Sequence, residues 1–510
     1  MRKFLLCASI LVLVTACEPK PAAETDMAGE TPAADMAMAP NAEHYDGKPV
    51  SPIKRVADAP VSTFAVDVDT GAYANVRRFL KKGETPPPEA VRTEELLNYF
   101  RYDYPLPADR SQPFSITTDV STTPWNANSR LLRVALRAYD VPRNARPPAN
   151  LVFLIDVSGS MDEPDKLPLV KTALRLVADN MRRDDKVSIV VYAGAAGMVL
   201  EPTSDPSKVR AALDRLEAGG STAGGEGIAL AYATAKDSFI EGGINRVILA
   251  TDGDFNVGIT DTSAVEALVK SNKDAGITLT TLGFGEGNYN DAMMEQIADV
   301  GNGNYAYIDS ASEARKVLDD ELSSTLVTVA QDVKIQVEFN PAQVSQYRLI
   351  GYENRALKEE DFNNDAVDAG DIGAGHQVTA IYEIVPAGAT GWVSERHFDG
   401  SNPPVVTKAS NDLVWVKLRY KLPNGKESKL IEQAVPASAM TQATAPKGDM
   451  AFAASVAAYG QLLRGDTNMG KFTMADVRAL AGRPEGYVRS EFVELTRLAE
   501  TKTAAVGNEE

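Results

Sequence analysis

The strongest constraint on the fold of this chain is the regular alternation of strand and helix patterns across residues 149–326. Residues 150–155 form an apolar run in which only Asn150 is polar, and residues 246–250 contain another apolar run. Such runs are typical of parallel strands that are buried on both faces. Strands that alternate with helices predict an α/β fold, with a central doubly wound and mostly parallel sheet. We expect strands at 150–155, 186–192, 246–250, 277–282 and 305–308, and helices at 166–181, 207–216, 227–239, 263–273, 291–299 and 312–326.

The regions on either side of this domain carry different patterns. Residues 51–148 combine alternating strand patterns with helical patterns at 73–82 and 90–100, which predicts an N-terminal α+β segment. Residues 327–500 begin with alternating strands and continue with helical patterns, which predicts a C-terminal domain that is β-rich and then helical. A chain of 510 residues has room for about three domains.

The N-terminus has the features of a bacterial lipoprotein signal. Arg2 and Lys3 precede an apolar run at 4–14, which is too short to span a bilayer comfortably. The run leads into Val-Thr-Ala-Cys17, which resembles a lipobox, the signal in which the chain is cut before a cysteine that is then lipidated. We therefore expect residues 1–17 to be a signal peptide and Cys17 to carry the lipid anchor. The alternative is an ordinary signal peptide with an incidental cysteine.

Residues 18–50 follow this signal and are rich in Ala, Pro, Glu, Asp and Met, without apolar periodicity. This composition predicts a disordered tether between the lipid and the folded body. Glu18 stands where an aspartate would signal retention in the inner membrane. The expected location is therefore the bacterial cell envelope, anchored to the membrane by lipid, with the outer membrane favoured.

Composition excludes several classes of function. The net charge of −18 argues against nucleic acid as a partner. The two cysteines, Cys7 and Cys17, both lie in the signal region, so the mature body has neither a disulfide framework nor a thiolate metal site. The three histidines are scattered along the chain, which argues against a His-rich zinc site.

Oxygen ligands gather at the ends of the predicted buried strands. The first of these strands ends in Asp156-Val-Ser158-Gly-Ser160, and the strand at 246–250 is followed by Thr-Asp252-Gly-Asp. In open α/β sheets, ligands bind beyond the carboxyl ends of the strands. These side chains are therefore expected to meet at one crevice.

A glycine-rich loop at 219–225 is expected to reach the same crevice. It supplies another hydroxyl, from Thr222 or from the adjacent Ser221, and its glycines allow close approach of the backbone. Two further acids, Glu226 and Asp254, lie nearby in the sequence.

Hydroxyl and carboxylate oxygens are hard ligands, which favour Mg²⁺, Mn²⁺ or Ca²⁺. Calcium usually takes more carboxylate or carbonyl oxygens than the two or three carboxylates present, whereas Mg²⁺ accepts an octahedral shell completed by water. A Mg²⁺ ion that is weakly neutralised stays electrophilic. It would accept an acidic side chain from a partner as its sixth ligand, without any bond being made or broken.

These residues resemble the metal-ion-dependent adhesion site of von Willebrand factor type A domains. The resemblance implies that Ser158, Ser160 and Thr222 contact the metal directly, with Thr222 preferred to Ser221 from its offset to the glycine pair. It implies that Asp156 and Asp252 act mostly through water. The implied cofactor is Mg²⁺ or Mn²⁺, and the implied partner is a protein that offers Glu or Asp.

The likeness covers residues 149–325 in strand and helix order as well as in motif. Outside them, short segments are similar to those of bacterial von Willebrand A lipoproteins. These segments are 64–69, 77–80, 86–88, 92–95 and 124–125 in the N-terminal region, and 418–421 and 452–460 in the C-terminal region.

Together these features predict a binding protein of the envelope, not an enzyme. One alternative is a structural scaffold of the envelope that the metal stabilises. Another is a metal-dependent hydrolase, in which Asp254 or Glu226 would act as the base because no histidine lies in the expected crevice.

Four acids of the N-terminal segment are expected to have structural roles. Asp67 and Asp69 are expected on the solvated face of a strand at 64–69. Glu94 and Glu95 are expected to begin or face a helix, not to form a catalytic pair.

Overall fold

The computed structural model describes most of the chain after the N-terminal region. The described residues are 43–220, 224–253, 262–287, 289–321, 324, 326–394, 411–423 and 425–506. Cys17 and the rest of the predicted signal lie outside them.

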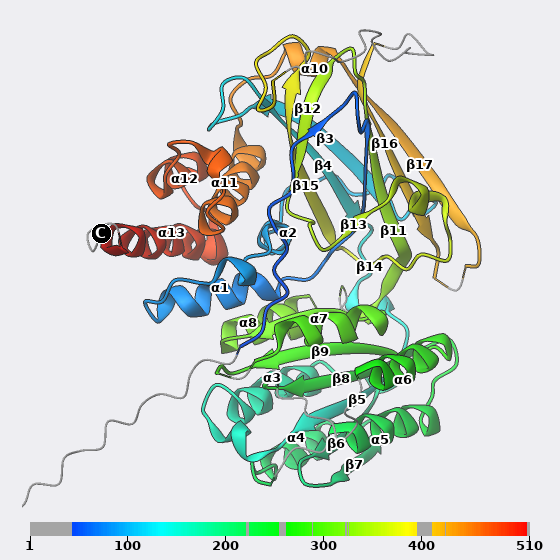
Figure 1. Ribbon diagram of the computed structural model, residues 1–510. Coiled ribbons are helices and arrows are strands. Elements are labelled where there is room, and N and C mark those ends of the chain that lie inside the picture. Colours follow the sequence, from blue (N-terminus) through cyan, green and yellow to red (C-terminus); the bar gives the residue numbers. More distant parts are fainter. Residues whose placement is uncertain are drawn as a thin grey trace, which may run out of the picture. The chain divides into compact units, whose positions relative to one another are not determined.

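A six-stranded sheet forms the α/β domain (Figure 1). Its strand order is β10-β9-β8-β5-β6-β7, and every neighbouring pair is parallel except β6 and β7. The predicted mostly parallel sheet is therefore confirmed, with one antiparallel edge strand. The strands are β5 (Ala149–Asp156), β6 (Lys186–Tyr192), β7 (Ala196–Thr203), β8 (Ile244–Thr251), β9 (Thr278–Phe284) and β10 (Tyr305–Ile308).

Helices cover both faces of this sheet, as a doubly wound fold requires. Apolar side chains of α3, α4 and α8 share a buried cluster with one face, and those of α5, α6 and α7 share a cluster with the other. β5 and β8 contribute to both clusters, which explains why their sequences are apolar at consecutive positions. The helices are α3 (Leu167–Asp179), α4 (Pro206–Asp214), α5 (Gly224–Asp237), α6 (Thr262–Asp274), α7 (Asp291–Val300) and α8 (Ala311–Arg315).

The structure differs from the prediction of one regular helix at 312–326. α8 ends at Arg315 and continues as a π-helical stretch, η4 (Lys316–Asp320). Of the residues that follow, 322, 323 and 325 lie outside the described part of the chain.

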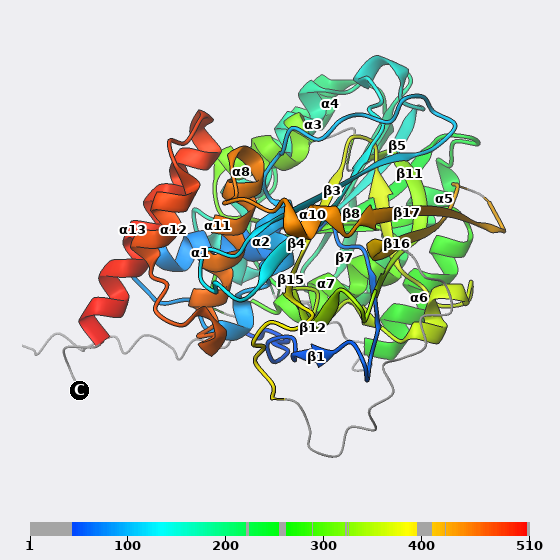
Figure 2. The same cartoon turned by 90° about the horizontal axis from the view of Figure 1, so that it is seen from above.

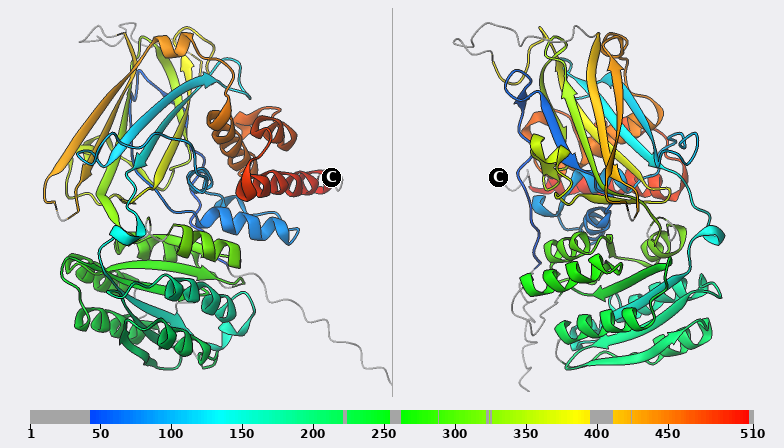
Figure 3. Two further views of the ribbon diagram at one scale, coloured as in Figure 1. Left: turned by 180° about the vertical axis from the view of Figure 1, so that it is seen from behind. Right: turned by 90° about the vertical axis from the view of Figure 1, so that its right-hand side faces the viewer.

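Two antiparallel sheets pack face to face around a second core (Figure 3). The first has the order β1-β12-β15-β4-β3, and the second has the order β13-β2-β11-β16-β17, with β14 paired to β11. The strands of the first sheet are β1 (Lys54–Arg55), β3 (Phe114–Thr122), β4 (Arg130–Ala138), β12 (Val344–Ile350) and β15 (Gln377–Pro386). Those of the second are β2 (Val61–Ala65), β11 (Thr328–Phe339), β13 (Ala356–Leu357), β14 (Gly370–Gly373), β16 (Asp412–Lys421) and β17 (Ser428–Pro436).

Each of these sheets combines strands from both flanking regions. β2 pairs with β11, which places Phe64 opposite Ile335, and β4 pairs with β15, which places Val134 opposite Ala380. The α/β domain is therefore an insertion between β4 and β11 of a sandwich that both flanks build.

A group of helices covers the outer face of the first sheet (Figure 2). Leu131 and Ala135 of β4 and Ile381 of β15 share a buried cluster with these helices. The helices are α1 (Gly71–Lys81), α2 (Thr93–Asn98), α11 (Gly448–Leu463), α12 (Met474–Ala481) and α13 (Gly486–Val506). Short helices elsewhere are α10 (Ser438–Thr441), η1 (Pro88–Ala90), η2 (Arg143–Ala145), η3 (Gly159–Asp162), η5 (Glu359–Asn363) and η6 (Thr467–Met469).

The last part of the predicted tether is held against the body. The Glu43 carboxylate accepts hydrogen bonds from Arg78 at 2.8 and 2.9 Å. His44 forms a β-bridge with Asn290, just before α7. Of the predicted tether, Glu43 and His44 are therefore attached to the folded body.

None of the helices within the described ranges combines the length and the apolar content needed to cross a membrane.

Candidate metal site

Asp156 is the last residue of β5 and its side chain is buried and oriented by hydrogen bonds. Oδ1 accepts from the Ser158 backbone N–H at 2.9 Å, and Oδ2 accepts from the Thr251 hydroxyl at 3.0 Å. Burial raises the pKa of Asp156, and the negative charge of Asp252 raises it further, whereas the hydrogen bonds from Ser158 and Thr251 lower it. The carboxylate is thus fixed at the C-terminal end of the sheet.

Ser158 and Ser160 lie on the turn that follows. Their Oγ atoms are 3.1 Å apart, Ser158 is buried and Ser160 is exposed. Two neighbouring ligands of an octahedral ion, each about 2.1 Å from it, are about 3 Å apart. The two hydroxyls therefore fit adjacent positions around a Mg²⁺-sized ion.

The glycine-rich loop begins beside this turn. The Gly219 N–H donates to the Val157 carbonyl at 2.7 Å, and the Gly159 N–H donates to the Gly220 carbonyl at 3.0 Å. The loop therefore approaches the Asp156 turn as expected. Thr222 and Ser221 lie outside the described residues, so the preference for Thr222 stays a prediction.

Asp252 follows β8, the parallel neighbour of β5. Its side chain is buried, and one carboxylate oxygen lies 2.9 Å from Nζ of Lys166. Gly253 has a φ of +85°, and a Cβ added there would lie 2.6 Å from the Asn290 nitrogen. Only glycine suits this turn, which sets the direction of the chain just after Asp252.

The structure thus brings Asp156, Ser158, Ser160 and Asp252 to one end of the sheet. Glu226 lies in the first turn of α5 and is exposed. Asp254 lies outside the described residues.

Lys166 is the member of this group that sequence reasoning missed. It is the N-cap residue of α3 and is 7% exposed. Its spacing from Asp252 along the chain gives no signal, because Lys166 precedes α3, Asp252 follows β8, and only the folded chain brings the two side chains together.

A second polar cluster lies where the N-terminal segment meets α7. Carboxylate oxygens of Asp67, Glu95 and Glu295 lie within 4.8 Å of one another, and all three side chains are buried. Arg92 forms an ion pair with Glu95 and Arg355 forms ion pairs with Asp67 and Glu295. These three acids are therefore already joined by guanidinium groups, which explains their convergence without a metal.

The expectation that Asp67 and Asp69 face solvent is wrong. β2 ends at Ala65, and both acids are buried beyond it. Arg355 lies 3.2 Å from Asp67 and 3.3 Å from Asp69. Burial and the neighbouring charge of Asp67 raise the pKa of Asp69 well above its ordinary value.

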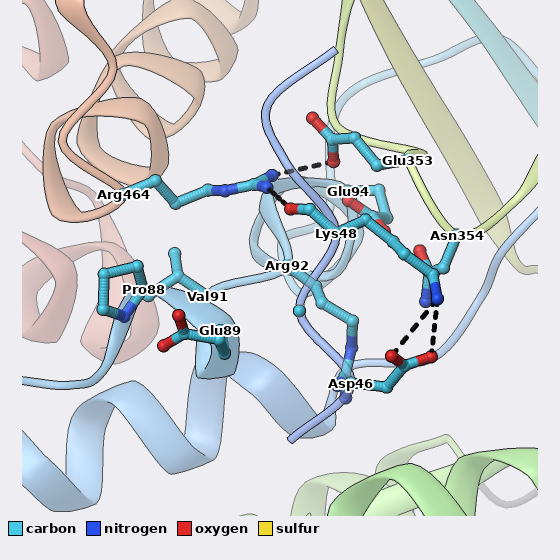
Figure 4. A pocket seen from close by; sticks show the side chains of 11 residues that line it. Asp46, Lys48, Pro88, Glu89, Val91, Arg92, Glu94, Glu353, Asn354 and Arg464 are labelled. Carbon is cyan, nitrogen blue, oxygen red and sulfur yellow. Dashed lines mark hydrogen bonds and ion pairs between the residues drawn. The ribbon is translucent and has the colours of Figure 1, made fainter.

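Glu94 and Glu95 begin α2, as expected, but both are buried. Glu94 lines a cavity of about 10 Å³, close to the volume of one water (Figure 4). Glu353 also lines this cavity and is held by Arg464 at 2.7 Å. Burial and the charge of Glu353 raise the pKa of Glu94 to about 7.

Three family models match successive parts of the chain. Residues 150–321 match the von Willebrand factor type A domain, residues 39–133 match a model described as von Willebrand factor, and residues 324–501 match the C-terminal region of the uncharacterized protein YfbK. A von Willebrand factor type A domain implies, in general terms, a protein-interaction or adhesion type of function.

Two relatives match this chain over very different lengths. The uncharacterized protein YfbK of Escherichia coli (strain K12) is 46% identical over 477 residues, which is 91% of this chain and 82% of that protein. An uncharacterized protein of Synechocystis sp. is 33% identical over 189 residues, which is 37% of this chain and 44% of that protein.

One solved structure, described as von Willebrand factor type A from Catenulispora acidiphila, has a TM-score of 0.42 at 18% identity, covering 78% of this chain and 91% of that chain. The sequence match to the Escherichia coli protein extends over both flanking regions as well as the inserted domain. The chain belongs to the family of bacterial von Willebrand factor type A domain proteins that includes YfbK.

Proposed function

We propose that this chain is a binding protein of the bacterial envelope that captures an acidic side chain of a protein partner through a bound Mg²⁺ or Mn²⁺ ion. Cys17 would anchor it to the membrane by lipid. The residues that would hold the metal are Asp156, Ser158, Ser160, Thr222 and Asp252.

The observation that carries this proposal is the pair of hydroxyls on the Asp156 turn. The Oγ atoms of Ser158 and Ser160 are 3.1 Å apart on the turn that follows the buried Asp156, and the buried Asp252 lies at the same end of the sheet. Neutral hydroxyls as direct ligands would leave most of the charge of the ion in place. The bound ion would therefore attract a carboxylate from outside.

The proposed metal-binding residues differ in solvent exposure, and a metal site open to a partner needs such a difference. Asp156, Ser158 and Asp252 are buried, whereas Ser160 is exposed. An ion at the two hydroxyls would be enclosed on the side of the sheet and accessible on the side of Ser160. A partner would approach from that side.

The metal is tested by binding of Mn²⁺ to the purified protein, followed by electron paramagnetic resonance. Asp156→Ala should weaken Mn²⁺ binding by about 10- to 100-fold, the range for groups that orient metal ligands. Ser158→Ala, which removes a proposed direct ligand, should weaken it at least as much. Ser207→Ala is the matched control, because Ser207 is an exposed serine on α4 of the same domain. Unchanged Mn²⁺ affinity in Asp156→Ala would refute the proposed site.

The partner is tested by capture from envelope extract in Mg²⁺ and in EDTA, with the wild-type protein and with Ser160→Ala as bait. Proteins held in Mg²⁺ should be lost in EDTA and absent from the variant. Capture that is equal under all these conditions, together with a large fall in melting temperature on chelation, would favour the scaffold role instead.

The anchor is tested by fractionation of cells that express the full chain. Wild-type protein should sediment with the outer membrane. Cys17→Ser should appear in the soluble fraction, because the substitution removes the residue that would carry the anchoring acyl chains. Membrane attachment that survives this substitution would reject the lipid anchor.

A further inference from the structure

Lys166 contributes a buried positive charge to the candidate metal site. Its Nζ lies 2.9 Å from Oδ2 of Asp252, and the two side chains are 9% and 1% exposed. The stem of Lys166 packs against Gly285, where a Cβ would collide with it. The lysine is therefore seated in the fold, and its charge is a fixed feature of the site.

This ion pair changes the net charge of the side chains that would surround a bound metal. Asp156 and Asp252 alone would balance a divalent ion. Lys166 offsets one of these two carboxylates, so a metal together with these three side chains would carry one net positive charge. In a poorly solvated site, one such charge interacts with its neighbours more strongly than it would in water.

We infer that Lys166 makes the metal site dependent on an anionic partner: it weakens binding of the metal alone and leaves one positive charge for a carboxylate to neutralise. This inference rests on the proposed metal site. Because binding effects are reciprocal, a carboxylate that binds more tightly in the presence of the metal must raise the affinity of the metal by the same factor. Lys166 would thus be a positioning residue that couples the two ligands.

The first test measures the affinity of the whole protein for Mn²⁺ alone. Lys166→Met should bind Mn²⁺ at least about tenfold more tightly than wild type, because a positive charge beside the ion has been removed. Lys166→Gln tests the same point with a side chain that still donates a hydrogen bond to Asp252. The matched control is Lys171→Met, since Lys171 lies on the same helix and its Nζ donates to the Leu216 carbonyl instead of a carboxylate.

The second test repeats the Mn²⁺ titration with acetate as the probe for a partner carboxylate. Acetate should raise the Mn²⁺ affinity of wild type and of Lys171→Met, and should raise that of Lys166→Met and Lys166→Gln less. Thermal unfolding in EDTA shows whether Lys166→Met and Lys166→Gln are folded. The Mn²⁺ affinities of wild type are then compared with those of the folded variant.

The outcomes separate this inference from the proposed metal site. If wild type binds Mn²⁺ and Asp156→Ala does not, while the Lys166 variants bind it no more tightly than wild type, the metal site stands and the role of Lys166 is refuted. If neither wild type nor the Lys166 variants bind Mn²⁺, the proposed function fails and this inference fails with it.

Discussion

Arg77 and Asp309 form a bidentate ion pair in which Nε lies 2.6 Å from Oδ2 and Nη2 lies 2.5 Å from Oδ1. Arg77 belongs to α1, and Asp309 directly follows β10 of the inserted domain. The same guanidinium donates to Glu313 of α8 at 2.7 Å and to Glu491 of α13 at 3.0 Å. One buried side chain thus joins the N-terminal segment, the α/β domain and the C-terminal helices.

Replacement of Arg77 by Met should destabilise the protein strongly. Three carboxylates would lose their shared partner while they remain buried, and breaking a buried ion pair by removing one partner costs about 3–5 kcal/mol. The measurement is the free energy of unfolding in urea, taken from the first transition. Arg175→Met is the control, because Arg175 pairs with Asp214 at the exposed surface, where such pairs contribute about 0–1 kcal/mol. Equal losses in both variants would contradict this role of Arg77.

The order of strands and helices in the α/β domain could be predicted because its strands are buried on both faces. β5 and β8 are therefore apolar at consecutive positions, which is a local signal in the sequence. Since ligands bind beyond the carboxyl ends of such strands, the approach of Asp156 to Asp252 could be predicted as well. Their role as metal ligands stays a prediction.

The partners of the buried charges could not be predicted, because each comes from a distant part of the chain. Arg355 meets Asp67 across 288 positions, and Lys166 meets Asp252 across 86. Alternation around Asp67 indicated a solvated strand face, since a sequence pattern shows polarity and does not show which arginine will cover it. The pairing of β2 with β11 has the same cause, because no local pattern specifies a strand partner beyond an inserted domain.

Gly253→Ala should disturb the end of β8 more than an ordinary glycine replacement does. Gly253 has a positive φ, and a Cβ there would press on the backbone nitrogen of Asn290. The loss of stability should exceed the cost of the positive φ alone, which is of order 1 kcal/mol. Because Asp252 adjoins this glycine, Mn²⁺ binding should weaken as well.

Gly242→Ala is the control for Gly253→Ala. Gly242 also has a positive φ, of +67°, but a Cβ there would have nothing within 4 Å. Thermal unfolding and Mn²⁺ titration of the two variants separate backbone strain from the contact with Asn290. Equal effects in both variants would show that the contact does not matter.

Glu94→Gln should remove part of the pH dependence of stability. Burial and the charge of Glu353 raise the pKa of Glu94 from 4.5 to about 7. Since the folded state holds this proton more tightly than the unfolded state, Glu94 favours folding most below pH 4.5, and this contribution is lost as pH rises to about 7. The free energy of unfolding of Glu94→Gln, measured relative to that of wild type, should therefore rise by roughly 2–3 kcal/mol from pH 5 to pH 8.

The measurement for Glu94→Gln is urea unfolding of both proteins at the two pH values. Glu89→Gln is the matched control, because Glu89 lines the same cavity but is exposed. This control should show the same difference between pH 5 and pH 8 as wild type. A Glu94→Gln variant whose stability changes with pH as that of wild type does would show that Glu94 does not titrate in this range.

Arg78→Met should release residues 43–45 from the body. Arg78 donates to the Glu43 carboxylate at 2.8 and 2.9 Å and to the Tyr45 hydroxyl at 3.1 Å. Without these contacts, limited proteolysis followed by mass spectrometry should show faster cleavage in this segment, because proteases cut backbone that is not held in place. Lys82→Met is the control, since Lys82 follows α1 and its Glu286 partner lies at the surface. Cleavage at equal rates in both variants would show that the segment is held by other contacts, such as the bridge between His44 and Asn290.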